Sequence, residues 1–288
     1  MTLKEKIKNK KFIITSEIGP PKGIDVKTIL EEARLLKGRV DAVNVTDSQS
    51  AVMRLGSLAV SRLLKEEGVE PVYQLTCRDR NRIALQSDAL SAAVLGIENI
   101  LVLTGDHPSR GDHPEAKPVF DLDSVQLIET LRKLESGKDL SGKELKGVPK
   151  FCVGAVVNPG ADPVEPELIK FEKKLKAGAE FFQTQGVYDV KTFAKFIDKV
   201  KQYNTCIIAG IILIKSPDMA RFMNKNVAGI FIPDSLIKEV EGAADKQDKA
   251  FEIAARTITG LKGLAQGVHL MSLGWNKLVP RILDAAGL

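Results

Sequence analysis

Short apolar runs alternate with amphipathic segments along almost the whole chain. Segment 25–37 is typical, because its apolar side chains recur at helical spacing and Asp25 is placed as an N-cap. The apolar runs predict strands at residues 12–17, 40–46, 71–77, 99–104, 151–157, 179–185, 206–212 and 267–273. The amphipathic segments predict helices at residues 25–37, 51–67, 81–95, 122–135, 165–177, 190–203, 216–224 and 244–265, followed by a final helix at 275–286.

Strands joined by helical crossovers predict a parallel sheet, and eight strands are the number that closes a barrel. We therefore expect an α/β protein with a single (β/α)8 TIM-barrel domain over residues 1–288. Residues 227–232 also look like a strand, but Pro233 stops them and a helix follows, so we treat them as an extra segment of the last crossover. The alternative is an open, doubly wound sheet of nine strands. It is disfavoured because the chain has neither a dinucleotide-type Gly-x-Gly-x-x-Gly after a strand nor a phosphate loop.

Composition narrows the class of protein. The chain is 44% hydrophobic and 27% charged with a net charge of +5, which is typical of a globular protein. Its lysines are scattered with few aromatic residues among them, which favours a solvated surface over a nucleic-acid groove. No apolar stretch approaches the roughly 20 residues of a membrane span, and the apolar run at 12–14 is too short for a secretory signal. We expect a cytoplasmic protein that binds neither nucleic acid nor membrane.

The cysteines and histidines predict no metal site. Cys77, Cys152 and Cys206 lie far apart in apolar runs, which indicates buried, reduced thiols. The three histidines show no metal-ligand spacing. Gly-Asp-His-Pro occurs at 105–108 and again at 111–114, and such a duplication suggests a metal loop. The second copy follows no strand, however, so we assign it no role.

Polar residues gather where the predicted strands end. They are Ser16-Glu17, Thr46-Asp47, Thr76-Cys77-Arg78, Thr104-Gly105-Asp106, Asn158-Pro159, Gln183-Thr184-Gln185 and Ser272. The amino-terminal ends of the strands show no such series. In barrels of this kind the active site lies at the carboxyl ends of the strands, so we expect a site on this rim.

Glu17 and Asp106 are the candidate acid–base residues, because two carboxylates in different surroundings can divide acid and base roles. The alternative is that Glu17 caps a loop or pairs with a lysine and that Asp106 caps the next helix. Lys170, Lys173 and Lys174 follow the fifth strand, and 170 and 174 share one helix face. They are candidates for phosphate binding, although the residues alone favour a solvated helix face.

Four segments resemble motifs of the methylenetetrahydrofolate reductase family. They are Thr-Ser-Glu-Ile-Gly-Pro-Pro at 15–21, Tyr-Gln-Leu-Thr-Cys at 73–77, Leu-Thr-Gly-Asp-His-Pro at 103–108 and Thr-Gln at 184–185. They occur in the family's order, and the resemblance extends over about 12–273, as the catalytic domain alone. The resemblance implies a barrel that holds FAD at its carboxyl rim. It implies hydride transfer from a reduced donor through FAD to 5,10-methylenetetrahydrofolate, which yields 5-methyltetrahydrofolate.

The resemblance also implies a role for individual residues. Glu17 matches the general acid that protonates N10 of the folate, Asp106 matches the carboxylate that stabilises the iminium cation, and Gln185 matches a folate contact. The implied flavin contacts are Thr46, Asp47, Gln74, Gly105, Asp106, Phe120, Ala155, Asn158, Glu167, Lys170, Lys173 and Lys174. The three lysines would lie by the FAD phosphates.

Several positions depart from the family's bacterial pattern. Gln74 replaces a histidine, Phe120 replaces a tyrosine, and Trp275 replaces an arginine that reaches substrate. Met219 and Met223 lie near positions of a glutamine and of a phenylalanine that stacks on nicotinamide and folate. The electron donor is therefore left open between NAD(P)H and an electron-donating partner protein, in a homo-oligomer or a hetero-complex.

Two other readings of the function are open. The first is a barrel methyltransferase or lyase that acts on a pterin or a phosphorylated metabolite. The second is a flavin-binding, non-catalytic subunit of an electron-transfer complex.

Overall fold

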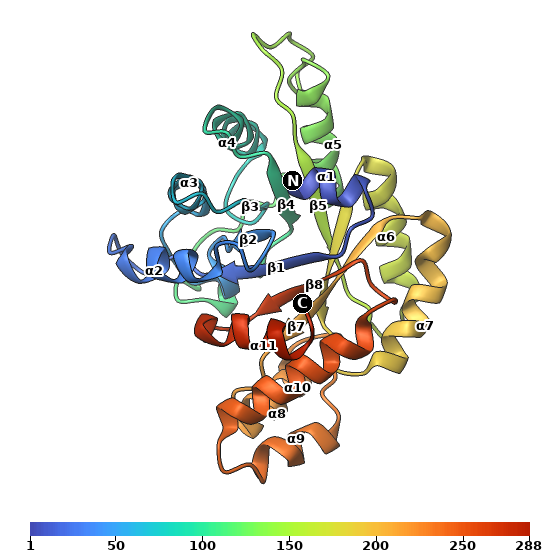
Figure 1. The fold of residues 1–288 in the computed structure, drawn as a ribbon. Coiled ribbons are helices and arrows are strands. Elements are labelled where there is room, and N and C mark those ends of the chain that lie inside the picture. Colours follow the sequence, from blue (N-terminus) through green and yellow to red (C-terminus); the bar gives the residue numbers. More distant parts are fainter.

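The computed structural model describes residues 1–288 and contains a closed barrel of eight parallel strands in sequence order. Figure 1 shows the helices arranged around it. The strands are β1 (Ile13–Ile18), β2 (Ala42–Val45), β3 (Pro71–Thr76), β4 (Asn99–Leu103), β5 (Cys152–Val157), β6 (Phe181–Gly186), β7 (Cys206–Ile212) and β8 (Gly267–Met271). The barrel closes where β1 pairs with β8. The expected TIM barrel is confirmed, and the open nine-stranded sheet is wrong.

The helices surround the barrel, and the first of them lies across its amino end. They are α1 (Leu3–Lys8), α2 (Lys27–Leu36), α3 (Ser57–Glu66), α4 (Arg82–Val94), α5 (Ser124–Glu135), α6 (Glu165–Ala177), α7 (Val190–Val200), α8 (Pro217–Asn226), α9 (Asp234–Glu241), α10 (Lys246–Leu261) and α11 (Val279–Ala285). The helix expected at 51–67 begins only at Ser57, after the short 3₁₀ turn η1 (Gln49–Ala51). The N-cap of α2 is Val26 and not Asp25 as expected, although the Asp25 carboxylate accepts a hydrogen bond at 3.0 Å from the N–H of Lys27, the first helical residue. No helix has the length and apolar character needed to cross a membrane.

Residues 227–232 form no strand and connect α8 to α9. The Asn224 side chain holds this connection, since it accepts from the Ile232 N–H at 2.7 Å and donates to the Ile232 carbonyl at 2.9 Å. Ile230 and Ile232 are buried in a separate apolar cluster with side chains of α8 and α9. The strand-like composition therefore reflects packing of an excursion in the last crossover, which lies below the barrel in Figure 1.

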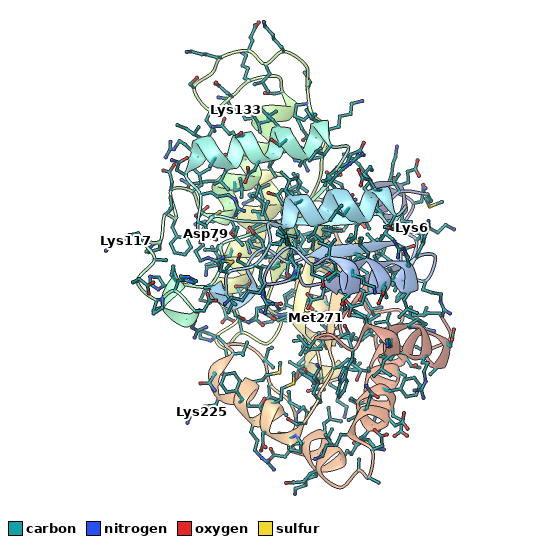
Figure 2. The ribbon with its side chains drawn as sticks, turned by 90° about the vertical axis from the view of Figure 1, so that its left-hand side faces the viewer. Lys6, Asp79, Lys117, Lys133, Lys225 and Met271 are labelled. Carbon is teal, nitrogen blue, oxygen red and sulfur yellow. The ribbon has the colours of Figure 1, made fainter.

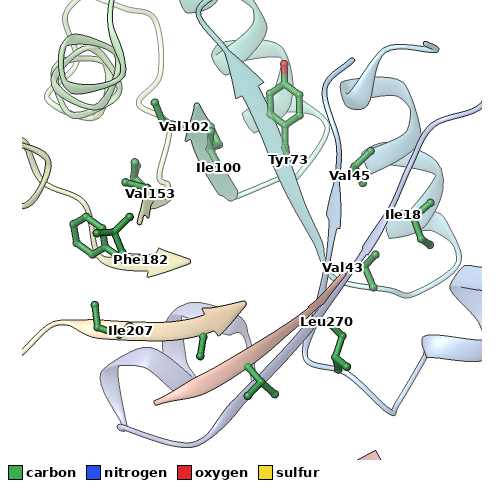
Figure 3. Close-up of a cluster of buried hydrophobic side chains, with 14 of the residues drawn as sticks. Ile18, Val43, Val45, Tyr73, Ile100, Val102, Val153, Phe182, Ile207 and Leu270 are labelled. Atoms are coloured by element: carbon green, nitrogen blue, oxygen red, sulfur yellow. The ribbon is translucent and has the colours of Figure 1, made fainter. Parts of the chain in front are cut away.

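The main apolar core lies between the strands and the surrounding helices. Figure 3 shows part of it, with Val43 from β2, Tyr73 from β3 and Phe182 from β6 among its members. A second cluster includes Ile13, Val72 and Phe181, which belong to the opposite face of their strands. Since neighbouring side chains of a strand point to opposite faces, these residues fill the barrel interior at its amino end.

Two features close the amino end of the interior. Leu3 of α1 is fully buried in the same cluster and plugs the opening. Gly154 of β5 leaves room for the Phe181 ring, because a Cβ at Gly154 would lie 2.2 Å from that ring.

Figure 2 shows Lys6 of α1 on one side of the molecule. Lys117, in the loop after β4, and Lys225 of α8 lie on the other side. The apolar amino end and the polar carboxyl end are thus separated along the barrel axis.

Candidate active site

A cavity of about 370 Å3 opens at the carboxyl ends of the strands. Its polar and charged lining residues are Glu17, Thr46, Asp47, Gln49, Ser50, Gln74, Thr76, Arg78, Thr104, Asp106, Ser124, Lys174, Gln183, Thr184, Gln185 and His269. A second cavity, of about 580 Å3, shares Glu17 and Thr46 with it. A third, of about 650 Å3, shares Asp106, Gln185 and Met271. The rim therefore carries the concave, polar surface that the strand ends predict.

Glu17 is a buried carboxyl group of this rim. It belongs to β1, is 8% exposed, and lines both the first and the second cavity. Its Oε2 lies 3.7 Å from Nε2 of His269 on β8, and the two side chains are 9% and 4% exposed. Glu17 caps no loop and pairs with no lysine, so the structural alternative for this residue is not observed.

Beneath Glu17 the barrel interior carries a layer of hydrogen-bonded polar side chains. The Asn44 and Gln183 amides bond to each other, at 2.6 and 3.2 Å. Gln183 also donates to Thr15 Oγ1 at 3.3 Å, and Thr15 Oγ1 lies 2.9 Å from Nδ1 of His269. The layer separates the apolar plug from the cavity, and buried polar groups satisfied in this way hold one another rigidly.

Asp106 lies on the opposite side of the cavity, after β4. It is exposed, lines the first and third cavities, and its carboxylate accepts no hydrogen bond from the protein. Gly105 turns the chain there with φ +92°, and a Cβ on it would lie 2.9 Å from the Arg78 Cβ. Glycine tolerates the positive φ and has no Cβ to clash with Arg78. The turn at Gly105 therefore directs the Asp106 side chain to the cavity.

Asp47 has a supporting role in this structure. Its carboxylate accepts hydrogen bonds from the Thr76 N–H at 3.0 Å, the Thr76 hydroxyl at 2.8 Å and the Arg80 guanidinium at 2.7 Å. Burial lowers the pKa of Arg80, but Asp47 together with Tyr73 and Asp88 outweighs burial, so the net pKa is raised. The acceptor capacity of Asp47 is thus largely used in fixing Thr76 and Arg80, beside the cavity.

Two cations lie in the cavity wall. The Arg78 side chain is almost fully buried and forms a bidentate pair with Asp79, at 2.8 and 2.7 Å. Lys174 is also buried, and its Nζ donates to the Val156 carbonyl at 2.7 Å. Burial lowers the pKa of Lys174. Since a lysine ammonium has three donors, Lys174 retains hydrogen-bonding capacity for an anion.

The structure brings only part of the predicted flavin set to the cavity. Thr46, Asp47, Gln74, Gly105, Asp106 and Lys174 line it, as does the predicted folate contact Gln185. Lys170 and Lys173 are exposed on α6 and lie outside the lining. Phe120 lies outside it as well, where its ring stacks near that of His107.

The β5 region departs most from the prediction. The Ala155 side chain is fully buried in the core between strands and helices, while its neighbour Val156 lines the cavity. The Asn158 side chain bonds the Ala228 carbonyl at 2.9 Å, and Glu167 accepts from the Asn158 N–H at 3.0 Å. Asn158 and Glu167 therefore join the β5 loop to α6 and to the α8–α9 connection, outside the cavity lining.

His269 is the titratable lining residue that the sequence analysis did not select, and the polar residues Gln49, Ser50 and Ser124 were not selected either. It lies within the apolar run of β8, and its register partner on β1 is Thr15. Thr15 and Glu17 share one face of β1, so strand alternation places His269 in the interior with them. The sequence signal for this position is the spacing of Gly267, His269 and Met271, because every second residue of a strand lies on the same face. Met271 also lines the cavity and lies near the centre of Figure 2.

The second Gly-Asp-His-Pro copy joins three rim loops. Asp112 forms an ion pair with Lys22, accepts from the Met53 N–H at 3.0 Å, and lies 2.9 Å from Nδ1 of His113. The Lys22 ammonium and these other donors hold the pKa of Asp112 well below its usual value. The segment assigned no role from sequence thus fixes the β1, β2 and β4 loops relative to one another.

Comparison with known proteins agrees with this architecture. The chain is 27% identical over 258 residues to methylenetetrahydrofolate reductase 2 of Schizosaccharomyces pombe, which covers 81% of this chain and 38% of that protein. It is 27% identical over 201 residues to 5,10-methylenetetrahydrofolate reductase of Pectobacterium carotovorum, which covers 69% of this chain and 60% of that protein. The chain thus spans less than two thirds of the length of either relative.

Among solved structures, a Clostridium thermocellum protein that binds two copies of 5-methyl-5,6,7,8-tetrahydrofolic acid has the same fold. Its TM-score is 0.67 at 18% identity, over 97% of this chain and 98% of that chain. The family profile described as methylenetetrahydrofolate reductase matches residues 2–287. The chain therefore belongs to the methylenetetrahydrofolate reductase family.

Proposed function

We propose that the protein uses FAD to reduce 5,10-methylenetetrahydrofolate to 5-methyltetrahydrofolate. The observation that carries the proposal is that Glu17 and Asp106 line one rim cavity from opposite sides, with different surroundings. Glu17 is buried beside His269, whereas Asp106 is exposed and has no protein partner. The family match over residues 2–287 supplies the reaction class. The folate bound by the Clostridium thermocellum protein supports the same class of substrate.

Glu17 acts as the general acid in this proposal. It is the deeper carboxyl group, and it is reached from both the first and the second cavity. A substrate nitrogen placed within about 3 Å of its oxygens receives the proton, which opens the bridging ring of the folate. The buried setting limits exchange of that proton with bulk water.

Asp106 stabilises the cation that forms when the ring opens. Its carboxylate faces two cavities and is not neutralised by a protein cation, so its charge is available to the substrate. A fixed negative charge beside a developing positive charge lowers the barrier most when water is displaced. Gln185 lines the same two cavities and donates or accepts hydrogen bonds to the folate.

The residues of the rim fit a flavin dinucleotide. Lys174 offers a buried ammonium with spare donors for a phosphate, and Gly105 lines the cavity with backbone alone, packed against the Arg78 and Thr76 side chains. The Thr46, Thr76 and Thr104 hydroxyls line the same cavity. FAD supplies the hydride carrier when bound. The reduced donor is NAD(P)H or an electron-donating partner protein.

The absorption spectrum of the purified chain is the first test. We expect a yellow protein, or one that becomes yellow on reconstitution with FAD. Oxidation of 5-methyltetrahydrofolate with an artificial dye then measures the folate reaction without any assumption about the donor. A colourless protein that FAD does not reconstitute contradicts the proposal and favours a barrel methyltransferase or lyase.

Variants of the two carboxylates test their roles. We expect Glu17→Gln to lower folate turnover by about 10²- to 10⁴-fold, the usual contribution of a general acid, while the flavin still binds and is still reduced. Asp106→Asn should lower turnover as well, because the cation loses its counter-charge. Asp198→Asn, on the exposed surface of α7, is the matched control. Unchanged activity of an assembly that contains Glu17→Gln would favour the non-catalytic flavin-binding subunit.

A further inference from the structure

We propose that His269 is a positioning residue for Glu17, held in one tautomer by a chain of interior hydrogen bonds. In this tautomer Nε2 carries the proton and faces Oε2 of Glu17, to which it donates when substrate closes the site, and this leaves Oε1 for the substrate. The inferred tautomer depends only on the hydrogen bonds in the barrel interior. Its catalytic consequence rests on the proposed role of Glu17 as general acid.

The chain starts at the paired amides of Asn44 and Gln183. Asn44 Nδ2 donates to Gln183 Oε1 at 2.6 Å, and Gln183 Nε2 donates back to Asn44 Oδ1 at 3.2 Å. The second N–H of Gln183 then points to Thr15 Oγ1 at 3.3 Å. All three side chains are buried, so no solvent competes for these groups.

Thr15 links the Gln183 amide to His269 and determines which of the two groups donates in the next hydrogen bond. Its hydroxyl oxygen accepts from Gln183, so its single hydrogen is free to be donated. Nδ1 of His269 lies 2.9 Å away, whereas the Val268 carbonyl lies 3.5 Å away. The shorter contact favours donation to Nδ1, which is then unprotonated, and the neutral imidazole carries its hydrogen on Nε2.

Nε2 of His269 faces Oε2 of Glu17 at 3.7 Å. This distance exceeds that of a hydrogen bond, and catalytic hydrogen bonds commonly shorten when substrate closes the site. A donor fixed on Oε2 makes that oxygen the acceptor of the carboxyl group. Once the contact shortens, the proton of Glu17 resides on Oε1, and the donor on Oε2 holds the carboxyl plane during the reaction.

Nuclear magnetic resonance of ¹⁵N-histidine in the full chain tests the tautomer directly. The chain has three histidines, and His107 and His113 are exposed, so the buried His269 signal is distinguishable. We expect an unprotonated Nδ1 and a protonated Nε2. A proton on Nδ1 would mean that the series of hydrogen bonds runs in the opposite direction, and this result overturns the proposal.

Thr15→Val removes the donor to Nδ1 with little change of shape. The variant should populate both tautomers, or the Nδ1–H form, while the thermal transition stays cooperative. A tautomer that is unchanged in Thr15→Val overturns the claim that the hydrogen-bonded chain sets it. This measurement needs neither FAD nor folate.

Substitution of His269 tests the consequence for the reaction. His269→Leu should lower kcat for the folate reaction by about ten- to a hundredfold, as loss of an orienting partner commonly does, with little change in KM. His269→Gln places an amide N–H near the position of Nε2 and should retain most of kcat. Flavin reduction by an artificial reductant should stay unchanged in both variants.

The outcomes separate this inference from the proposed function. If Glu17→Gln loses folate turnover but His269→Leu and His269→Gln are equally active, the positioning role is refuted and the proposed function stands. If Glu17→Gln retains turnover, the proposed function fails, while the tautomer measurement still decides the geometry. A loss of activity that is equal in Leu and Gln variants also refutes positioning by an Nε2–H donor.

Discussion

Lys174 shows how a single buried charge links the cavity wall to ligand binding. Its ammonium has one protein acceptor, the Val156 carbonyl at 2.7 Å, and burial lowers its pKa. Taking a charge out of water costs free energy unless it is fully paired. We interpret this incompletely paired lysine as a group whose remaining donors are completed by an anionic ligand.

Lys174→Met keeps the length of the side chain and removes the charge. We expect the flavin affinity, measured by quenching of flavin fluorescence, to fall about ten- to a hundredfold, which corresponds to about 1.5–3 kcal/mol for one charged hydrogen bond. The thermal stability of the flavin-free chain should be unchanged or higher. Lys173→Met, at an exposed neighbour, is the control. Equal flavin affinity in the two variants contradicts the role of Lys174.

Strand alternation explains which site residues the sequence located and which it did not. Glu17, Thr46 and Gln185 follow or end strands whose carboxyl ends meet at the rim, so sequence alone placed them. Ala155 was selected one position away from Val156, and a shift of one residue exchanges the two faces of a strand. His269 was missed because its interior position depends on register with Thr15, a pairing between distant segments.

At the scale of elements, the strands were predictable because both of their faces are buried. Parallel barrel strands read as continuous apolar runs for that reason. Residues 227–232 look like a strand for a related reason, since their apolar side chains pack with those of α8 and α9, and their assignment to the last crossover is confirmed. α1 was missed because its sequence is rich in lysine and only Leu3 is fully buried. Its helical start is fixed by a capping box between Thr2 and Glu5.

Leu3 makes α1 a plug of the barrel, at the end away from the cavity. Leu3→Ala should lower the free energy of unfolding by about 2–5 kcal/mol, because the side chain is fully buried and the barrel wall cannot collapse into the space. Urea denaturation measures this change. Leu35→Ala, at a position 39% exposed on α2, should cost much less. Folate turnover per folded molecule should be the same in both variants, and a selective loss in Leu3→Ala would show coupling between the two ends.

For the whole molecule, the barrel divides stability and chemistry between its two ends. The amino end is closed by apolar side chains, and the carboxyl end carries the cavities and the polar loops. A layer that includes Thr15 and His269 lies between them. The rim loops share few side chains with the core. They can therefore become locally more mobile while the core stays folded.

Asp112 tests this division, because it joins three rim loops and belongs to none of the three apolar clusters. Its pKa is lowered in the folded chain, so its contacts are present above its ordinary value of 3.8 and are lost as the pH falls through the lowered value. Asp112→Asn removes the ion pair with Lys22 at every pH. Amide hydrogen exchange should therefore accelerate in residues 108–117 and around Met53, with no change in the barrel strands. Glu115→Gln, an exposed neighbour in the same loop, should leave exchange unaltered. Faster exchange throughout the strands of Asp112→Asn would mean that the rim loops also hold the barrel together.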